Sequence, residues 1–189
     1  MRKPGPSLGK GLLSAALCSL TFAGAFAQTA APPTGGTAAS GTATLSHADK
    51  KFVEDAAAGG MAEVELGKLA EQRASNPQVK QFGSRMVQDH GKANDELRSL
   101  ASSKGVQVPA ALPKSKQADL DKLGKMSGAD FDKAYMKHMV DDHKHDVSMF
   151  EKQSKSGQDT DLKAWAGKTL PTLREHQQLA QTFHASVNK

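Results

Sequence analysis

The stretch AEVELGKLAEQRASNPQVKQFGSRMVQDH, residues 62–90, decides the fold class, because it contains two amphipathic segments and the turn between them. Apolar and small residues recur at spacings of three and four on both sides of the turn, as they do on one face of a helix. Asn76 is a favoured residue at a helix start, and Pro77 is tolerated in the first helical turn. The stretch therefore predicts a helical hairpin.

The rest of the chain extends this pattern to four long helices and one short one. Ser46 with Asp49, and Ser127 with Asp130, have the spacing of a capping box at a helix start. No alternating run of β-branched residues predicts a strand. We expect helices over about 47–74, 77–104, 114–125, 127–156 and 159–189. Two long hairpins joined by a crossover that contains a short helix predict an all-α, ferritin-like four-helix bundle.

The first 27 residues have the three parts of a secretory signal peptide. Basic residues open the chain, residues 12–25 are apolar, and Ala25-Phe26-Ala27 is a small-residue cleavage site before Gln28. The apolar run is shorter than the roughly 20 residues of a membrane-spanning helix, so an anchor is the less favoured interpretation. A lipid anchor on Cys18 is a second alternative, although the bulky Leu17 precedes that cysteine.

Cleavage would change the composition of the working protein. Three of the 25 basic residues lie in the predicted signal, so the formal net charge falls from +5 to +2. Cys18 is the only cysteine, so the mature chain would form no disulfide. Residues 28–45 are uncharged and rich in Ala, Pro, Gly and Thr, which predicts a flexible tether before a domain over 46–189. From the predicted signal peptide we expect a periplasmic or secreted protein, or one associated with the cell envelope, with no membrane span after cleavage.

Each long helix carries one side chain that can bind a metal on its otherwise apolar face. These side chains are Glu63, His90, His143 and His176. Within each hairpin, the two members lie at heights that differ by about one turn or less, at about 1.5 Å per residue. We therefore expect all four in one layer of the core. One carboxylate and three imidazoles suit one divalent transition metal, such as Zn, Cu or Fe.

Further acidic and histidine residues surround this layer. Asp146 and Asp142 are candidate additional ligands. Neighbours on a helix point about 100° apart, so Asp89, Asp142 and Glu175 are poor co-ligands of the histidines that follow them. They could instead orient a histidine on another helix. His138, Asp142 and His145 share a second face, which we interpret as a solvated polar face rather than a metal site.

Two structural alternatives remain at this stage. The layer can be a Glu–His hydrogen-bond network that fixes the register of the helices without any metal. Pro171 predicts a kink in the last helix, or a break that divides it into two shorter helices.

Three stretches together resemble one known family. They are AAAGGMAEVELGKLAEQRASNPQVKQFGSRMVQDHGKANDELRSLASSKGV at 56–106, YMKHMVDDHKHDV at 135–147 and TLPTLREH at 169–176. They resemble the bacterial exported family called domain of unknown function 4142, over about residues 47–186. The resemblance implies a ferritin-like helical fold and a periplasmic or envelope location, and its members are often labelled outer membrane proteins. It implies no established activity.

Di-iron proteins of the ferritin-like group use a Glu-x-x-His pair on two helices, and this chain departs from that pattern. Val87, Val140 and Leu173 stand three residues before the three histidines. A mononuclear metal site, or no metal, therefore fits better than a di-iron site.

Two classes of function follow from these features. The first is an exported protein that binds one transition-metal ion through the Glu/His layer. The second is a structural or stress-related interaction protein of the envelope that binds no metal. An enzyme is less favoured, because the chain lacks a nucleophile–His–acid arrangement and a phosphate-binding Gly loop. The sequence has no cluster of basic residues with interleaved aromatics, so a nucleic-acid partner is not expected. It predicts neither a protein partner nor an oligomeric state.

Overall fold

The structure is a computed structural model that describes residues 45–189, and this part of the chain is all-helical with no strand. Its elements are α1 (His47–Arg73), α2 (Pro77–Ser103), α3 (Lys114–Gly124), α4 (Gly128–Ser156) and α5 (Thr160–Val187). The predicted helices are confirmed to within about two residues at each end. None of the described helices is long and apolar enough to cross a membrane.

The predicted signal peptide at 1–27 and the predicted tether at 28–45, apart from its last residue, lie outside the described residues. That last residue, Leu45, is only 5% exposed and packs in a core cluster with Phe52 and Val53.

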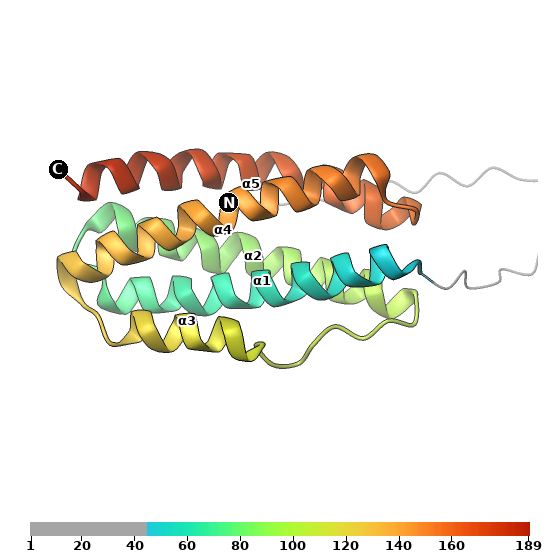
Figure 1. The fold of residues 1–189 in the computed structure, drawn as a ribbon, viewed down its shortest axis with the longest axis horizontal. Coiled ribbons are helices and arrows are strands. Elements are labelled where there is room, and N and C mark those ends of the chain that lie inside the picture. Colours follow the sequence, from blue (N-terminus) through green and yellow to red (C-terminus); the bar gives the residue numbers. More distant parts are fainter. Residues whose placement is uncertain (1–44) are drawn as a thin grey trace, which may run out of the picture. The chain divides into compact units, whose positions relative to one another are not determined.

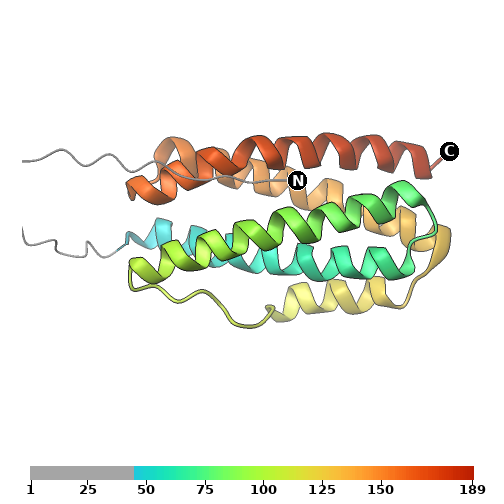
Figure 2. The same cartoon turned by 180° about the vertical axis from the view of Figure 1, so that it is seen from behind.

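Two helical hairpins pack against each other. α1 and α2 form the first hairpin and α4 and α5 the second, and Figures 1 and 2 show all four helices running along one common direction. α1 contacts α4, α2 contacts α5, and the short α3 lies against α1 on the connection between the hairpins. α5 continues through Pro171, so the alternative of a break into two shorter helices is wrong.

Local signals mark four helix starts, and the capping side chain makes its hydrogen bond at three of them. The side chains of Ser46, Asn76 and Asp159 each accept a hydrogen bond from a backbone N–H in the first turn that follows. Ser127 is the residue before the first turn of α4, as predicted, but its side chain makes no such bond. Gly128 has a φ of 64°, and this left-handed conformation bends the chain between Ser127 and the first turn of α4.

The core consists of two apolar clusters, one toward each end of the bundle. The first joins the start of α1 to the end of α2, and includes Phe52, Leu97 and Trp165. The second joins the end of α1 to the start of α2, and includes Leu66 and Phe82. The predicted histidine layer lies at the intermediate height on each helix, so it divides the apolar core in two.

Two buried aspartates bind the turn of the opposite hairpin. Asp49, near the start of α1, accepts hydrogen bonds from the backbone N–H groups of Gln158 and Asp159 in the α4–α5 turn. Asp132, near the start of α4, accepts them from Ser75 and Asn76 in the α1–α2 turn. The exposed fractions of Asp49 and Asp132 are 1% and 3%. Each hairpin therefore supplies the cap that the other hairpin's turn requires.

Candidate metal centre

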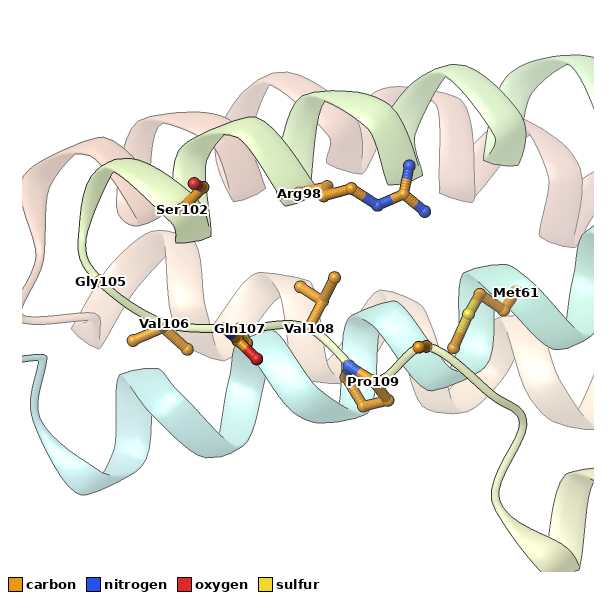
Figure 3. A pocket seen from close by; sticks show the side chains of 9 residues that line it. Met61, Arg98, Ser102, Gly105, Val106, Gln107, Val108 and Pro109 are labelled. Atoms are coloured by element: carbon orange, nitrogen blue, oxygen red, sulfur yellow. The ribbon is translucent and has the colours of Figure 1, made fainter.

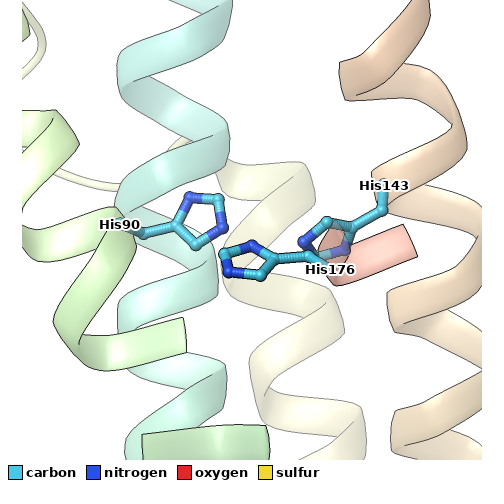
Figure 4. A group of neighbouring side chains, drawn as sticks. All are labelled: His90, His143 and His176. Atoms are coloured by element: carbon cyan, nitrogen blue, oxygen red, sulfur yellow. The ribbon is translucent and has the colours of Figure 1, made fainter. Parts of the chain in front are cut away.

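Three buried histidines from three helices meet in the middle of the bundle. His90 of α2, His143 of α4 and His176 of α5 each offer one ring nitrogen, and these nitrogens lie within 4.8 Å of one another. Figure 4 shows the three rings turned toward a common point. The ring centroids are 5.4 to 5.7 Å apart, and the exposed fractions are 6%, 0% and 0%. The three histidines thus lie at one height in the bundle, as expected from counting residues along the helices.

One nitrogen of each ring faces a protein acceptor. Nδ1 of His90 lies 2.8 Å from Oε2 of Glu63. Nδ1 of His143 lies 2.9 Å from the backbone oxygen of Met139, and Nε2 of His176 lies 2.8 Å from Oδ2 of Asp89. Such contacts fix both the orientation of a ring and the nitrogen that carries its proton.

The opposite nitrogen of each ring has no hydrogen-bond partner. These atoms are Nε2 of His90, Nε2 of His143 and Nδ1 of His176, and all three are fully buried. A buried nitrogen without a partner is costly, and such groups are uncommon in native proteins. The presence of three such nitrogens in one cluster therefore points to a ligand that binds all of them.

Glu63 of α1 lies beside two of the histidines rather than among the converging nitrogens. Its carboxylate is 0% exposed, and its Oε1 lies 3.4 Å from Nδ1 of His143. Its contact with His90 is short but not well directed as a hydrogen bond. The carboxylate therefore sits behind the His90 and His143 rings, on the side away from their unpartnered nitrogens, and is not part of the three-nitrogen group.

The charges of the cluster respond to burial and to each other. Burial opposes ionisation of Glu63, but His90 and His143 outweigh it and lower its pKa. Burial also opposes protonation of His90, but Glu63 outweighs it and raises the pKa of His90. Burial and the charge of His90 lower the pKa of His176 to about 4. Burial lowers the pKa of His143 as well, so these two imidazoles are neutral, as metal ligands must be.

The two aspartates named as candidate ligands lie in different surroundings. Asp146 is 9% exposed and lines a small cavity that also touches His90 and His176. Burial and the nearby Glu63 raise the pKa of Asp146 well above its ordinary value. Asp142 lies away from the cluster, where its carboxylate is 2.9 Å from Nζ of Lys116 in α3.

The face that carries His138 and His145 is held by ion pairs. Nε2 of His138 lies 3.3 Å from the Asp142 carboxylate, and His145 is exposed. The structure thus places Asp142 between a lysine and a histidine.

The acidic residues before the histidines divide into two cases. Asp89 orients His176 across the α2–α5 seam, as the sequence suggested for these residues. Glu175 binds no histidine and instead accepts a hydrogen bond from Arg85 at 2.8 Å. Arg85 also donates to Asp89 at 3.1 Å, so it links both acids. Sequence reasoning missed Arg85, and its position four residues before Asp89 was the one available signal.

A larger groove of about 530 Å³ lies away from the histidines, between α1, α2 and the segment at 105–110 (Figure 3). Its lining includes Met61 and Val108, and its one charged side chain is Arg98. The groove lacks histidine, cysteine and acidic side chains, so the Met61 thioether is the one usual transition-metal ligand among its lining side chains.

Comparisons with solved structures show a shared fold. A DUF305 protein from Streptomyces coelicolor, described as secreted, has a TM-score of 0.64 at 16% identity, covering 75% of this chain and 94% of its own. A DUF305 fragment from Deinococcus radiodurans has a TM-score of 0.64 at 10% identity, covering 76% and 97%. CopM in the Cu(II)-bound form has a TM-score of 0.62 at 17% identity, covering 73% and 96%.

At these identities the likeness concerns the fold alone. No curated protein matches this chain in sequence. The model of the family described as Domain of unknown function (DUF4142) matches residues 34–183, which is most of the chain. The resemblance seen in the three sequence stretches is thus confirmed, and the chain belongs to the DUF4142 family.

Proposed function

We propose that this protein is an exported metal-binding protein that holds one transition-metal ion through His90, His143 and His176. The observation that carries the proposal is the set of three converging, buried ring nitrogens without hydrogen-bond partners. An ion would supply the missing partner for all three at once. The opposite nitrogen of each ring already faces a carboxylate or a backbone carbonyl, which is the arrangement common to metal-binding histidines.

The spacing of the nitrogens is compatible with an ion after a small adjustment. Three ligands at 2.0–2.1 Å from one ion stand about 3.4 Å apart. The nitrogens lie within 4.8 Å of one another, so the rings would close by at most about 1.4 Å. Rotation about the side-chain bonds of three histidines on three separate helices can supply this movement.

Glu63 then has a different role from the fourth ligand suggested by its position on the helix. Its carboxylate lies 2.8 Å from Nδ1 of His90 and 3.4 Å from Nδ1 of His143, where its negative charge balances that of a bound cation. Asp146 or a water molecule in the adjacent cavity supplies the remaining ligand. A mononuclear site with three imidazoles and one open position fits Cu and Zn better than it fits a di-iron centre.

Copper is the first metal to test. The CopM structures, which share the fold, hold Cu(II), Cu(I) or Ag. Imidazole binds both oxidation states of copper, and three uncharged ligands suit a monovalent ion in a buried site. Zinc and iron remain the comparison ions.

The proposal includes a location and a finer fold class. The N-terminal sequence has the features of a cleaved signal, and the chain would act in the periplasm or outside the cell. The two hairpins, crossover and mid-bundle site together support a ferritin-like four-helix bundle as the architecture.

The test is metal content, measured on protein purified without a polyhistidine tag. After treatment with EDTA, the protein is incubated with Cu(I) under ascorbate, with Cu(II) or with Zn(II), desalted and analysed by mass spectrometry of the metal. We expect one ion per chain in the wild type and none in His143→Ala. His145→Ala is the matched control, because His145 is exposed and outside the cluster, and this variant should load fully.

The competing function is an envelope structural or interaction protein whose histidine layer serves packing alone. It predicts no stoichiometric metal in the wild type and the same melting temperature with and without a chelator. Equal metal content in the wild type and His143→Ala would therefore reject the metal-binding proposal. A chelator-induced fall in melting temperature, absent in His143→Ala, would reject the packing interpretation.

A further inference from the structure

The three histidines lie where an ion from solution cannot reach them directly. His143 and His176 are 0% exposed and His90 is 6% exposed. The apolar clusters on both sides of the layer close the site along the axis of the bundle. An ion that fills the site therefore needs a path between two helices.

A small cavity beside the cluster is lined by all four long helices, and its partly exposed lining residues all lie on α2 and α5. It has a volume of about 30 Å³, and His90 and His176 form part of its wall. Its outer wall consists of short, partly exposed side chains, namely Ala93, Asn94, Thr169 and Thr172. The same cavity is thus lined by partly exposed side chains of α2 and α5 and by two of the three histidine rings.

The lining of this cavity is mostly apolar, but three polar atoms of lining residues lack partners. Nε2 of His90, Nδ1 of His176 and Nε1 of Trp165 are buried without hydrogen-bond partners, and all three residues line it. A cavity of about 30 Å³ is large enough for one water molecule, and these three atoms are polar partners for it. An ion could therefore retain part of its hydration while it passes.

Acidic groups stand along the path. Asp146 lines the cavity at nine-tenths burial, and Asp89 lines it beside His176. Carboxylate oxygens bind transition-metal ions and exchange them with imidazole.

Two cross-seam ion pairs flank the opening. Arg85 and Glu175 are 2.8 Å apart on one side, and Glu96 and Lys168 are 3.1 Å apart on the other. They hold α2 and α5 together at both ends of the opening, and the small residues between them leave it unfilled.

We propose that the cavity between α2 and α5 is the route by which a metal ion reaches the three histidines, and that the Asp146 carboxylate binds the ion on the way. This inference rests on the proposed function. The ion exchanges a water ligand for an Asp146 oxygen, and then exchanges further waters for the ring nitrogens of His90, His176 and His143. Where Asp146 or the Nε2 atom of His90 carries a proton, that proton passes to water as the ion binds.

The chain contains its own reporter for this passage. Trp165 is the only tryptophan, and it lines the cavity. Cu(II) quenches tryptophan fluorescence at short range, so stopped-flow mixing of the metal-free protein with Cu(II) alone measures the rate of arrival. Metal analysis after the same mixing gives the final stoichiometry.

The test variants fill the outer wall of the cavity. Thr172→Leu and Ala93→Leu place extra carbons in it from opposite sides, and quenching should become at least about tenfold slower, because the added side chain obstructs a tightly packed opening. Thr182→Leu is the matched control on an exposed part of α5 and should quench at the wild-type rate. Asp146→Asn should also slow quenching.

The final stoichiometry separates the possible failures. Slow quenching to the wild-type amplitude in both cavity variants, each with the wild-type circular dichroism spectrum, supports the route. Wild-type rates in Thr172→Leu, Ala93→Leu and Asp146→Asn, with one copper per chain, would overturn it and leave the proposed function standing. Absence of copper from the wild type itself would reject the proposed function and the route with it.

Discussion

The contact between Asp89 and His176 provides a sharp test of the proposed metal site. Oδ2 of Asp89 lies 2.8 Å from Nε2 of His176 and 3.1 Å from Nε of Arg85. Burial opposes ionisation of Asp89, but its bonds to His176 and Arg85 outweigh it and lower its pKa. Asp89→Asn keeps the shape of the side chain and removes the charge. The amide cannot accept from both donors with the strength of a carboxylate.

The expected loss follows from the role of such partners in metal sites. Removing the carboxylate that orients a metal-binding histidine weakens metal binding by about 10- to 100-fold. With free metal at 100 times the wild-type Kd, binding stabilises the wild type by about 2.7 kcal/mol. The same metal concentration would stabilise Asp89→Asn by only about 0.4 to 1.4 kcal/mol. At about 3 °C per kcal/mol, the metal-induced rise in Tm falls from about 8 °C to between about 1 and 4 °C.

The assay is thermal unfolding followed by circular dichroism at equal free copper, with and without a chelator. Asp95→Asn is the control, because Asp95 is exposed on the same helix and pairs only with Arg98. Its metal-induced rise in Tm should equal that of the wild type. An undiminished rise in Asp89→Asn would refute the idea that Asp89 prepares His176 for a metal.

Three further predictions concern the scaffold. Asp132→Ala should lower the free energy of unfolding, measured in urea, by about 2–4 kcal/mol, because two backbone N–H groups of the α1–α2 turn lose their charged acceptor. An unchanged urea midpoint would contradict this role of Asp132. Gly83→Ala should destabilise the protein by about 1–3 kcal/mol, because the new Cβ would lie 2.8 Å from the backbone oxygen of Gly67 and 2.7 Å from a side chain of α1. The control Gly91→Ala should stabilise it by up to about 1 kcal/mol, because nothing lies within 4 Å of that Cβ. Equal urea midpoints for the two variants would be inconsistent with close α1–α2 packing. Burial opposes ionisation of Asp49, but hydrogen bonds from Gln153, Ser46 and the α4–α5 turn outweigh it and lower its pKa below 3.8. The Asp49 carboxylate therefore stabilises the fold above about pH 4 and loses that contribution as the pH falls further. The free energy of unfolding of Asp49→Asn should fall less steeply than that of the wild type between pH 5 and pH 2, and parallel curves would exclude Asp49 as a cause of the acid sensitivity.

Much of the fold follows from local signals in the sequence. The helix starts are marked by Ser46, Asn76 and Asp159, whose side chains accept hydrogen bonds from backbone N–H groups only a few residues further along. The spacing of the apolar residues indicates which face of each helix is buried. Counting residues from the hairpin turns also predicted that His90, His143 and His176 share a height, because the rise of a helix is nearly constant. The missing side-chain bond at Ser127 also has a local cause, since the left-handed Gly128 intervenes.

The remainder depends on contacts between distant parts of the chain. Sequence spacing places Glu63 on the inward face but cannot tell a ligand from a residue that stands behind two imidazoles. It also cannot tell that Asp89 binds His176 while Glu175 binds Arg85, because small rotations of the helices decide between them. The bonds of Asp49 and Asp132 to the opposite turns join residues more than fifty positions apart, and no local pattern announces them.

The exchange of caps between the hairpins has a consequence for how the molecule can be divided. A fragment ending after α2 would carry an α1–α2 turn whose N–H groups await Asp132, and the complementary fragment would carry a turn that awaits Asp49. Each half is therefore incomplete at the end that the other half finishes. The fragments should behave as a split protein that regains its helical structure on mixing, and the three histidines would meet only in the reassembled pair, since His90 belongs to one fragment and His143 and His176 to the other.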